Sequence, residues 1–405
     1  MTGGSADVLV VGGGMAAYRA ARTVAGGGSG RAVTIIGAEP EPPYDRPKLT
    51  KEFLQGRAEA ADVLFASADS LREQGIEAIG GATVTGLHPQ RNEVTLEDGR
   101  QWAFNDLIAA TGCRPRPLSL FPAGAGNVFH VHSLGEARRL RAAMNRLGPD
   151  GRLVIVGGGF IGTEVAYAAW LRRFSVTIIE RAGAPLSAAL GDESASRIGT
   201  VYQDAGVQLI LNDEIAGVKS DGTSVRQVTT AGGEVLDCDI VVVGIGTLPN
   251  TEWLEGSGVD LSDGAVTDAA GATSRPHVYS VGDVARWDRP HYGHIRIEHE
   301  TDAQNQAVVV GRTILGRRAR LAGLPYVWSD QFGLEIRYFG HCPRPGQSTL
   351  IERGRESFAT VYASDGVACA VATVNWPEAA APAKQLLGAR ETFDAERAAA
   401  TFSNL

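Results

Sequence analysis

The sequence lacks the features that would assign it to several common classes of protein. It holds four cysteines, and no two of them form a CxxC pair: Cys113, Cys238, Cys342 and Cys369. A zinc ribbon, a dithiol redox centre and a disulfide framework are therefore disfavoured, and isolated, inert thiols are the expectation. The chain has no HExxH motif, so we expect no metal site.

Long apolar runs and an excess of positive charge are also missing. No apolar run reaches the length of about 18 residues that indicates a transmembrane helix. The N-terminus, MTGGSADVLV, shows no signal-peptide pattern. The formal net charge is −8, which disfavours nucleic acid as a partner of the whole chain. The sequence therefore predicts a cytoplasmic protein that neither crosses a membrane nor binds nucleic acid.

Lysine is scarce as well, since only four of the 38 basic residues are lysines. Two of them, Lys48 and Lys51, lie within the short stretch RPKLTK at 46–51. Because the chain otherwise uses arginine for positive charge, these two lysines are candidate functional residues.

Two stretches of the chain share one pattern of buried strand, glycine-rich turn and helix. The first is VLVVGGGMAAYRAA at 8–21, and the second is LVIVGGGFIGTEVA at 153–166. Each is followed by a strand that ends in an acid, by a hairpin, and by a further buried strand, DLIAATG at 106–112 or DIVVVGIG at 239–246. This alternation predicts parallel α/β sheets, and a length of 405 residues predicts two or three domains.

The repeated turn carries a dinucleotide-binding fingerprint in each copy. The first copy consists of Gly12, Gly14 and Ala17, with Glu39 at the end of the next strand. The second copy consists of Gly157, Gly159 and Gly162, with Glu180 in the corresponding place. The first glycine permits the tight turn, the second lets the backbone approach a pyrophosphate, and the third small residue lets helix and strand pack closely. The acid accepts hydrogen bonds from ribose hydroxyls. The chain is therefore predicted to bind two dinucleotides.

The residue at the end of the second strand also bears on which nucleotide binds there. A carboxylate at Glu180 pairs with a free 2′-hydroxyl and repels a 2′-phosphate, which favours NADH over NADPH. The neighbouring Arg181 argues the other way, because an arginine at such a strand end can hold the phosphate. NADH is the expectation.

Further stretches of the sequence resemble one family. SVGDVA at 280–285, interpreted as a strand followed by Gly-Asp and a helix start, resembles the FAD-binding signature of the two-dinucleotide flavoprotein reductases. EPEPPYDRPKLTK at 39–51, RIEHETDAQNQA at 296–307 and YVWSDQFG at 326–333 resemble the oxygenase-coupled NADH–ferredoxin reductases. These FAD proteins supply electrons to ferredoxins that serve Rieske oxygenases and bacterial cytochromes P450.

The resemblance implies a fold and a domain order. It implies two Rossmann-like dinucleotide-binding domains plus a C-terminal α/β interface domain. The FAD-binding domain would comprise 1–115 and 245–322, the NAD-binding domain 116–244, and the interface domain 323–405. The NAD domain is expected to be inserted in the FAD domain, because the FAD aspartate, Asp283, follows the second nucleotide unit.

The resemblance also implies a role for individual residues. Those expected to hold FAD are Gly12, Gly14, Met15, Ala16, Ala17, Glu39, Arg46, Lys51, Val84, Ala110, Thr111, Gly112, Asp283, Glu300 and Trp328. Those expected to hold NAD are Gly157, Gly159, Phe160, Ile161, Gly162, Glu180 and Gly246. Lys51 and Glu164 would form an ion pair near flavin N5, where hydride arrives. The simpler alternatives are a core tryptophan at 328, a packing phenylalanine at 160 and a surface lysine at 51.

Two residues depart from the family pattern. His132 stands where the family usually has an arginine that contacts FAD. Glu300 stands where a tryptophan or an aliphatic residue is usual. A carboxylate beside the N1–C2=O region of the flavin would oppose an anionic hydroquinone and lower the flavin potential.

The implied activity is that of an NADH:ferredoxin reductase, in which FAD links a two-electron donor to a one-electron acceptor. Two other functions stay open: an NADH oxidase that passes electrons to oxygen, and an NADH-sensing flavoprotein with a signalling role. The partner would be an iron–sulfur ferredoxin, expected to be of the 2Fe–2S type, and the reductase a monomer or homodimer. Ferredoxins are acidic, so a basic patch is expected either at 311–321, with Arg312, Arg317 and Arg318, or at 136–146. The first patch is preferred.

Overall fold

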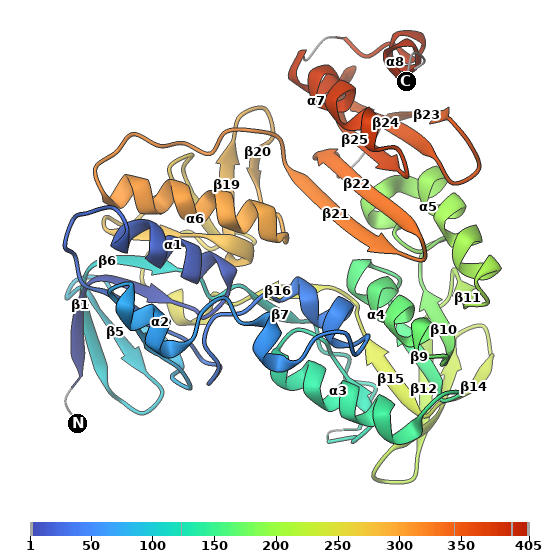
Figure 1. Ribbon diagram of the computed structural model, residues 1–405, viewed down its shortest axis with the longest axis horizontal. Coiled ribbons are helices and arrows are strands. Elements are labelled where there is room, and N and C mark those ends of the chain that lie inside the picture. Colours follow the sequence, from blue (N-terminus) through green and yellow to red (C-terminus); the bar gives the residue numbers. More distant parts are fainter. Residues whose placement is uncertain (1–2, 123, 344, 390–391, 403–405) are drawn as a thin grey trace. The chain divides into compact units, whose positions relative to one another are not determined.

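Contacts within the chain divide the computed structural model into two compact units (Figure 1). The structure describes residues 3–122, 124–343, 345–389 and 392–402. The first unit comprises 1–47, 60–114 and 247–323, and the second comprises 48–59, 115–246 and 324–405. Residues 48–59, which are expected in the FAD-binding domain, thus have their contacts in the second unit. The division into three domains stays a prediction.

The first unit is built on a seven-stranded sheet in the order β3-β2-β1-β6-β5-β4, with β18 paired to β6. Its strands are β1 (Gly4–Val11), β2 (Val33–Ile36), β3 (Ile76–Ile79), β4 (Val84–His88), β5 (Glu93–Leu96), β6 (Gln101–Ala109) and β18 (Val278–Ser280). β1 pairs in parallel with both β2 and β6. Parallel strands that are covered on both faces have continuous aliphatic sequences, because every side chain is buried. The buried stretch Val8–Val11 is an example. The parallel α/β prediction is confirmed.

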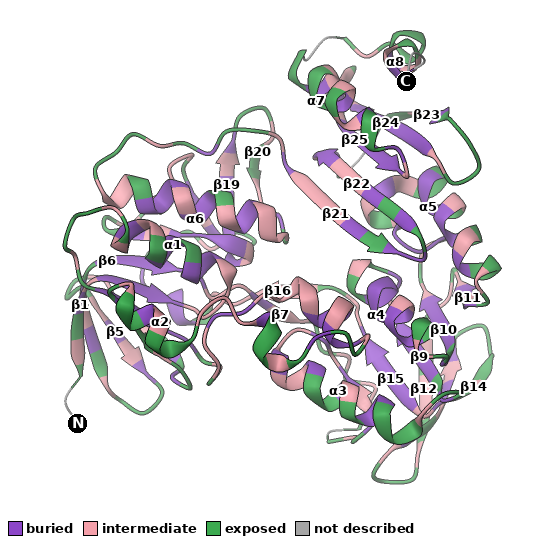
Figure 2. Cartoon of the chain, in the orientation of Figure 1, coloured by how far each residue is buried: buried purple, intermediate pink, exposed green. Residues whose placement is uncertain are grey.

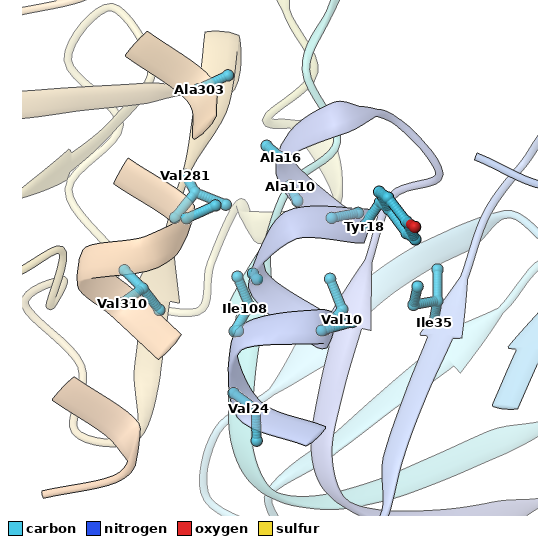
Figure 3. Packing of buried hydrophobic residues seen from close by; sticks show 14 of the residues in the cluster. Val10, Ala16, Tyr18, Val24, Ile35, Ile108, Ala110, Val281, Ala303 and Val310 are labelled. Atoms are coloured by element: carbon cyan, nitrogen blue, oxygen red, sulfur yellow. The ribbon is translucent and has the colours of Figure 1, made fainter. Parts of the chain in front are cut away.

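Two long helices pack against each other in the first unit. They are α1 (Met15–Ala25) and α6 (Glu300–Ile314). Figure 3 shows the cluster between them, in which Val24 of α1 and Val310 of α6 lie beside Ile108 of β6. A Cβ added at Gly311 would come within 2.6 Å of the Thr23 side chain, so the two helices approach closely at that glycine. The smaller elements of this unit are α2 (Ala68–Glu73), η2 (Ala60–Val63), η3 (Glu252–Leu254), η4 (Gly282–Val284), β16 (Thr247–Pro249), β17 (Ala265–Thr267), β19 (Ala285–Arg289) and β20 (Gly293–Ile295).

The second unit holds a five-stranded sheet in the order β11-β10-β9-β15-β8. These strands are β8 (Val128–Phe129), β9 (Arg152–Val156), β10 (Ser175–Glu180), β11 (Gln208–Leu211) and β15 (Ile240–Val243). Its helices are α3 (Leu134–Leu147), α4 (Phe160–Leu171) and α5 (Ser187–Asp204), and a π-helical segment, η1, runs from Leu49 to Phe53. β9 pairs in parallel with β10 and β15 and thereby repeats the arrangement of β1 with β2 and β6.

A second five-stranded sheet, antiparallel, lies in the C-terminal part of the second unit. Its order is β21-β22-β25-β24-β23. Its strands are β21 (Tyr326–Gln331), β22 (Leu334–Gly340), β23 (Gln347–Glu352), β24 (Phe358–Ser364) and β25 (Val367–Val374). α7 (Ala380–Ala389) packs against β25, and η5 (Pro377–Ala379) and α8 (Ala395–Phe402) complete the segment. In the described residues no helix combines the length and the apolar character needed to cross a membrane.

Both predicted hairpins are confirmed. β5 and β6 pair antiparallel around the turn at Asp98 and Gly99. β13 (Val225–Thr230) pairs antiparallel with β14 (Val235–Asp237), and β12 (Ile215–Ser220) adds a third strand. The short β7 (Cys113–Pro115) pairs with β16.

The helix start expected after Gly282-Asp283 is wrong. Those residues form the three-residue 3₁₀ helix η4, and the chain then enters the strand β19. β19 pairs with β17 and β20, and its burial alternates, with Trp287 fully buried. Sheet pairing and burial of the indole thus favour a strand over the helix that the small residues suggest.

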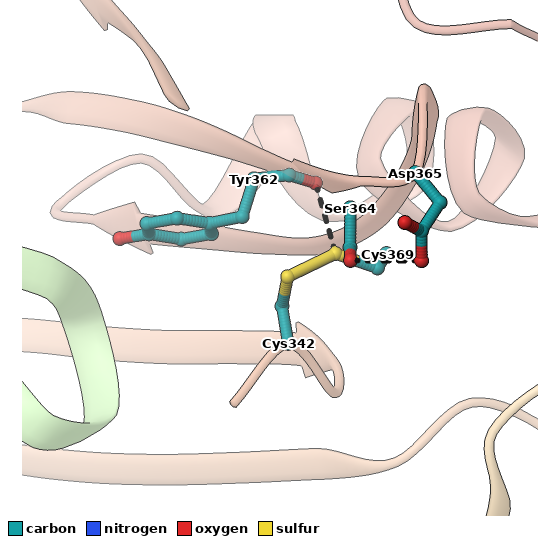
Figure 4. The surroundings of a disulfide bond; sticks show 5 residues. All are labelled: Cys342, Tyr362, Ser364, Asp365 and Cys369. Atoms are coloured by element: carbon teal, nitrogen blue, oxygen red, sulfur yellow. Dashed lines mark hydrogen bonds between the residues drawn. A yellow bond between two sulfur atoms is a disulfide. The ribbon is translucent and has the colours of Figure 1, made fainter. Parts of the chain in front are cut away.

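The expectation of isolated thiols is wrong for two of the four cysteines. Cys342 and Cys369 form a disulfide that links the segment after β22 to β25 (Figure 4). The two residues are 27 positions apart, so sequence spacing gives no sign of the bond. Their strands are neighbours, since Gly340 pairs with Ala370, and this pairing brings the cysteines together. Cys113 and Cys238 are free and buried, as expected.

Candidate functional site

The first glycine-rich turn lies between β1 and α1 and has the backbone that the fingerprint requires. Gly12 has a φ of +131°, and a Cβ added there would lie 2.0 Å from the carbonyl oxygen of Ala110. The helix cap, Gly14, carries no side-chain hydrogen bond, and the first turn of α1 has no acidic residue. The N–H groups of the first helical residues are therefore available to an anion. A dinucleotide pyrophosphate fits this turn.

The residues expected to surround that turn lie in the same unit. Met15, Ala16 and Ala17 form the first turn of α1, and Ala110 follows β6 directly. The Ala110 N–H donates to the carbonyl of Val11 at 2.8 Å. Thr111 is held by Asn250, whose carbonyl accepts from the Thr111 hydroxyl at 2.8 Å. Val84 begins β4 and is buried.

A carboxylate, a phenol and a guanidinium meet after β2. The Glu39 carboxylate accepts hydrogen bonds from Tyr44 at 2.6 Å and from Arg46 at 2.5 Å. Arg46 also donates to the Tyr44 hydroxyl at 2.9 Å. These contacts hold the predicted ribose acid and the predicted FAD arginine together. Glu39 is an acceptor suited to ribose hydroxyls, and Arg46 supplies positive charge beside it.

The turn that carries Asp283 is fixed from α6. The Gly282 N–H donates to Gln306 at 2.7 Å, and the Gln306 amide donates to Asp302 at 2.6 Å. Asp302 forms an ion pair with Arg289, and both side chains are almost fully buried. A Cβ added at Gly282 would come within 2.9 Å of Ala16, so this turn lies against the start of α1. The structure thus brings Asp283 to the first glycine-rich turn.

The Asp283 carboxyl has unusual neighbours. The Cys113 thiol donates to its Oδ2 at 3.7 Å. Burial and the nearby Glu298 raise the pKa of Asp283 to about 6. Burial and the charges of Asp283 and Glu298 also raise the pKa of Cys113 well above its usual range. The thiol therefore stays protonated at neutral pH and is a poor nucleophile.

The second glycine-rich turn lies between β9 and α4. Gly157 has a φ of +102°, and its added Cβ would lie 2.3 Å from the carbonyl oxygen of Gly244. At Gly162 an added Cβ would lie 2.1 Å from the carbonyl oxygen of Gly157, which explains the need for glycine at the third position. The cap of α4, Gly159, has no side-chain hydrogen bond either. This turn fits a second pyrophosphate for the same reason as the first.

Glu180, the predicted ribose acid of this unit, is fixed by two backbone donors. Its carboxylate accepts from Gly158 at 2.6 Å and from Ala182 at 2.8 Å. Arg181 points to Glu214, with 3.4 Å between the charged atoms, and its side chain is 82% exposed. Such an exposed ion pair is weak, so it does not withhold Arg181 from a 2′-phosphate, and the preference for NADH rests on Glu180 alone.

The other residues expected to hold NAD lie near this turn. Phe160 and Ile161 form the first turn of α4, and the Ile161 side chain is 44% exposed. Gly246 follows β15 with a φ of +99°, and its carbonyl accepts from the Arg116 N–H at 2.9 Å. The roles assigned to these residues stay predictions.

Lys51 and Glu164, predicted to form the ion pair for hydride transfer, do meet in the second unit. Lys51 Nζ lies 3.3 Å from Glu164 Oε1, and the two side chains are 13% and 8% exposed. The same ammonium lies 3.8 Å from the centre of the Trp328 ring, a cation–π distance. Lys51 is therefore no surface lysine: η1, α4 and β21 enclose its charge. The ion pair is observed, whereas its role in catalysis stays a prediction.

The two residues that depart from the family pattern, Glu300 and His132, both lie at the start of a helix. Glu300 is the first residue of α6, where a carboxylate also stabilises the helix N-terminus. The His132 N–H donates to the carboxylate of Glu136, which caps α3 together with Ser133. Glu300 thus has a local structural role of its own, whereas the contact of His132 is made by its backbone and does not require a histidine. Their predicted effect on a flavin stays a prediction.

Sequence reasoning missed several residues of these sites. Thr50 and Ser329 both donate to Glu164, and Gln306 with Asp302 holds the turn before Asp283. Thr50 and Ser329 directly adjoin the predicted residues Lys51 and Trp328, and both lie within stretches that carry the family resemblance, 39–51 and 326–333; these are the signals that could have indicated them. Contacts across more than one hundred positions have no local pattern.

The fold and the two glycine-rich turns define a class, the oxidoreductases with two dinucleotide-binding domains. The model of one family, described as pyridine nucleotide-disulphide oxidoreductase, matches residues 6–307, and a second model, described as reductase C-terminal, matches 326–405. The chain belongs to the pyridine nucleotide-disulphide oxidoreductase family.

Individual relatives match over nearly the full length. The chain is 30% identical to putidaredoxin reductase of Pseudomonas putida, with 94% of this chain and 91% of the relative covered. It is 33% identical to the ferredoxin–NAD(+) reductase component of an anthranilate 1,2-dioxygenase system of Burkholderia cepacia, with coverage of 98% and 97%. A solved covalent complex of putidaredoxin reductase with putidaredoxin matches with a TM-score of 0.91 at 28% identity, covering 97% of this chain and 95% of that chain.

The raised pKa of Asp283 predicts a pH-dependent effect of Asp283→Asn on the protein without FAD. A raised pKa means that the folded chain holds this proton more tightly than the unfolded chain. The stability so gained is complete below about pH 4 and is lost as the pH rises through 6. At pH 7.5 the variant should therefore melt about 2–4 °C higher than the wild type. This gain should disappear at pH 4.

Asp260→Asn is the matched control in the same unit. Hydrogen bonds from Ser262 lower the pKa of Asp260, so its removal should lower the melting temperature at pH 7.5. Equal melting temperatures of the wild type and Asp283→Asn at pH 7.5 would contradict the assignment for Asp283.

Proposed function

We propose that the chain is an NADH-dependent, FAD-containing reductase that passes single electrons to a ferredoxin serving a cytochrome P450 or a Rieske oxygenase. The observation that carries the proposal is the near full-length match to relatives named as ferredoxin reductases of such systems, including the C-terminal segment. The relatives in question are themselves named for putidaredoxin and for an anthranilate 1,2-dioxygenase system. The two open glycine-rich turns support the need for two dinucleotides.

Bound FAD would supply the step between a hydride donor and a one-electron acceptor. The protein residues would bind and orient. The first turn, Glu39 and Arg46 would hold the adenine nucleotide part of FAD, and Asp283 would accept from its ribityl chain. The second turn and Glu180 would hold NADH. Lys51 and Glu164 would provide a fixed charge pair close to flavin N5.

The cysteines argue against a thiol-dependent relative of this class. Cys342 and Cys369 are bonded to each other in the antiparallel sheet of the second unit. Cys113 is buried, and its raised pKa keeps it protonated. No cysteine occurs in 39–51, the loop after the first ribose acid, where single-cysteine oxidases and disulfide reductases of the coenzyme A type place theirs. Electrons would therefore leave the flavin directly.

The direct test is NADH-driven reduction of cytochrome c, with and without an added 2Fe–2S ferredoxin, while oxygen uptake is recorded. The proposal predicts that added ferredoxin greatly increases the rate of cytochrome c reduction, with little oxygen uptake. Oxygen uptake that matches NADH loss, with no gain from several ferredoxins, would instead identify an oxidase. A reduced flavin–NAD complex that survives in air would favour the signalling alternative.

We further propose that the ferredoxin docks on the basic patch of Arg312, Arg317 and Arg318. All three are exposed at the end of α6 and just beyond it. On the alternative patch, α3 exposes Arg138, Arg139 and Arg146 on the face opposite its buried residues (Figure 2), whereas Arg141 is bound to Glu59. An acidic partner is attracted by clustered exposed charge more than by paired charge.

Charge reversal tests this docking surface. Arg312→Glu combined with Arg317→Glu should raise the KM for ferredoxin several-fold, with the larger effect at low salt. Reduction of ferricyanide by NADH should be unchanged, because ferricyanide needs no docking surface. Arg138→Glu combined with Arg139→Glu is the matched control. A larger effect of this control pair would transfer the proposal to the α3 patch.

A further inference from the structure

The buried carboxylate of Glu164 is held by more than its ion pair. Its Oε2 accepts a hydrogen bond from the Thr50 hydroxyl at 2.5 Å, and its Oε1 accepts one from the Ser329 hydroxyl at 2.6 Å. The Lys51 ammonium is a longer contact, 3.3 Å from Oε1. The two hydroxyls are therefore the closest partners of the carboxylate, and each binds a different oxygen. Two donors on opposite oxygens fix the plane of a carboxylate, which a single ammonium does not.

These hydrogen bonds are shielded from water. Ser329 is 0% exposed and Thr50 is 3% exposed, whereas Glu164 is 6% exposed. Gln331, which is 1% exposed, donates to the Ser329 hydroxyl at 3.1 Å and thereby directs the Ser329 proton to Glu164. A hydroxyl bound to a buried carboxylate forms a short, charge-assisted hydrogen bond, and water does not replace it after removal.

The segments that hold Glu164 and its two donors, namely α4, η1 and β21, also determine the position of Lys51. Thr50 precedes Lys51 in η1, and Ser329 follows Trp328 in β21. The strand β21 thus restrains the ammonium twice, through the Trp328 ring and through Ser329 and Glu164. Arg337 lies 5.9 Å from the centre of the same ring, so the indole is flanked by two cations. An ammonium between an aromatic face and a carboxylate keeps its place only while the carboxylate keeps its orientation.

We propose that Thr50 and Ser329 are positioning residues: their hydroxyls orient the Glu164 carboxylate, which in turn fixes the ammonium of Lys51 for hydride transfer. The inference rests on the proposed function for the role of Lys51. Neither hydroxyl needs to touch a cofactor, because each acts through Glu164. Bound FAD would take up the hydride of NADH, an electron pair with its proton, and Thr50 and Ser329 would neither gain nor lose a proton.

The test compares hydroxyl deletions in the FAD-loaded protein. Ser329→Ala removes one donor, and Ser194→Ala is the matched control. Ser194 is also 0% exposed, in the same unit, but its hydroxyl bonds to Thr360 and Tyr362. Thr50→Val removes the second donor while keeping the shape, and Thr50→Ser restores a hydroxyl. This Thr50 pair decides the question if Ser329→Ala does not fold.

The first readout is anaerobic stopped-flow reduction of the flavin by NADH. Ser329→Ala and Thr50→Val should slow the limiting rate about tenfold or more, as expected for loss of a hydrogen bond to a charged group. Thr50→Ser and Ser194→Ala should stay close to the wild type. In a Glu164→Gln background, Ser329→Ala should cause little further loss, because both changes act through one carboxylate.

The second readout reports on Lys51 without any turnover. The chain has only four lysines, so a protein labelled with carbon-13 at lysine Cε gives at most four signals. Lys51→Arg identifies the signal of Lys51. A fixed lysine shows two different Hε shifts, and a mobile one shows a single averaged shift. Ser329→Ala should merge the two Hε shifts of Lys51 into one averaged shift, whereas Ser194→Ala should leave them separate.

The outcomes separate this inference from the proposed function. A wild-type flavin that NADH does not reduce would contradict the proposed function, and the lysine signals would still decide the positioning role. Ser329→Ala that matches Ser194→Ala in the lysine spectrum would overturn the inference even if NADH reduces the flavin. A slower rate with an unchanged Lys51 signal would overturn it too, because Ser329 would then act by another route.

Discussion

The close approach of a glycine turn to the end of the neighbouring strand is the constraint on which both units depend. Gly12 and Gly157 have φ values of +131° and +102°, and an added Cβ would lie 2.0 Å from Ala110 and 2.3 Å from Gly244, respectively. Only glycine tolerates both the conformation and the distance. Each turn also places an uncapped helix N-terminus at the carboxyl end of its strand, as in α1 after β1 and α4 after β9. The rest of each site, including Glu39 and Glu180, is arranged around that end of the sheet.

The two strand–turn–helix units and the hairpins could be predicted from the sequence, because the residues that specify each of them are close together in the chain. A buried aliphatic run, three glycines and a helical spacing lie within fourteen residues in each copy, and each hairpin is marked by its own turn. The disulfide between Cys342 and Cys369 could not be predicted, since it depends on which strands are neighbours in the antiparallel sheet. Nor could the strand β19, because the preceding residues of SVGDVA at 280–285 suggest a helix start until sheet pairing is known.

The functional residues also divide into those that the sequence could indicate and those that depend on the fold. The Lys51–Glu164 pair was expected through resemblance to a family, and the structure brings the two together from segments 113 positions apart. Thr50 and Ser329 carry no pattern of their own, although they are the shortest contacts of the carboxylate. A buried charge is stable only when its remaining oxygens are satisfied, so such partners follow from the physics of burial once the fold is known. The assignment of the donors therefore depends on the fold rather than on a motif.

The central claim is that each glycine turn holds its own dinucleotide, and a methyl group tests it. Gly14 and Gly159 have φ values of −90° and −73°, which alanine adopts without strain. Nothing lies within 4 Å of an added Cβ at Gly159, and only Arg46 does at Gly14. Both alanine variants should therefore fold, with a methyl group in the space meant for a pyrophosphate. The measurement is FAD content together with NADH affinity by equilibrium titration. The account predicts that Gly14→Ala loses FAD, whereas Gly159→Ala retains FAD and loses NADH affinity. Full FAD content in Gly14→Ala, or wild-type NADH affinity in Gly159→Ala, would contradict it.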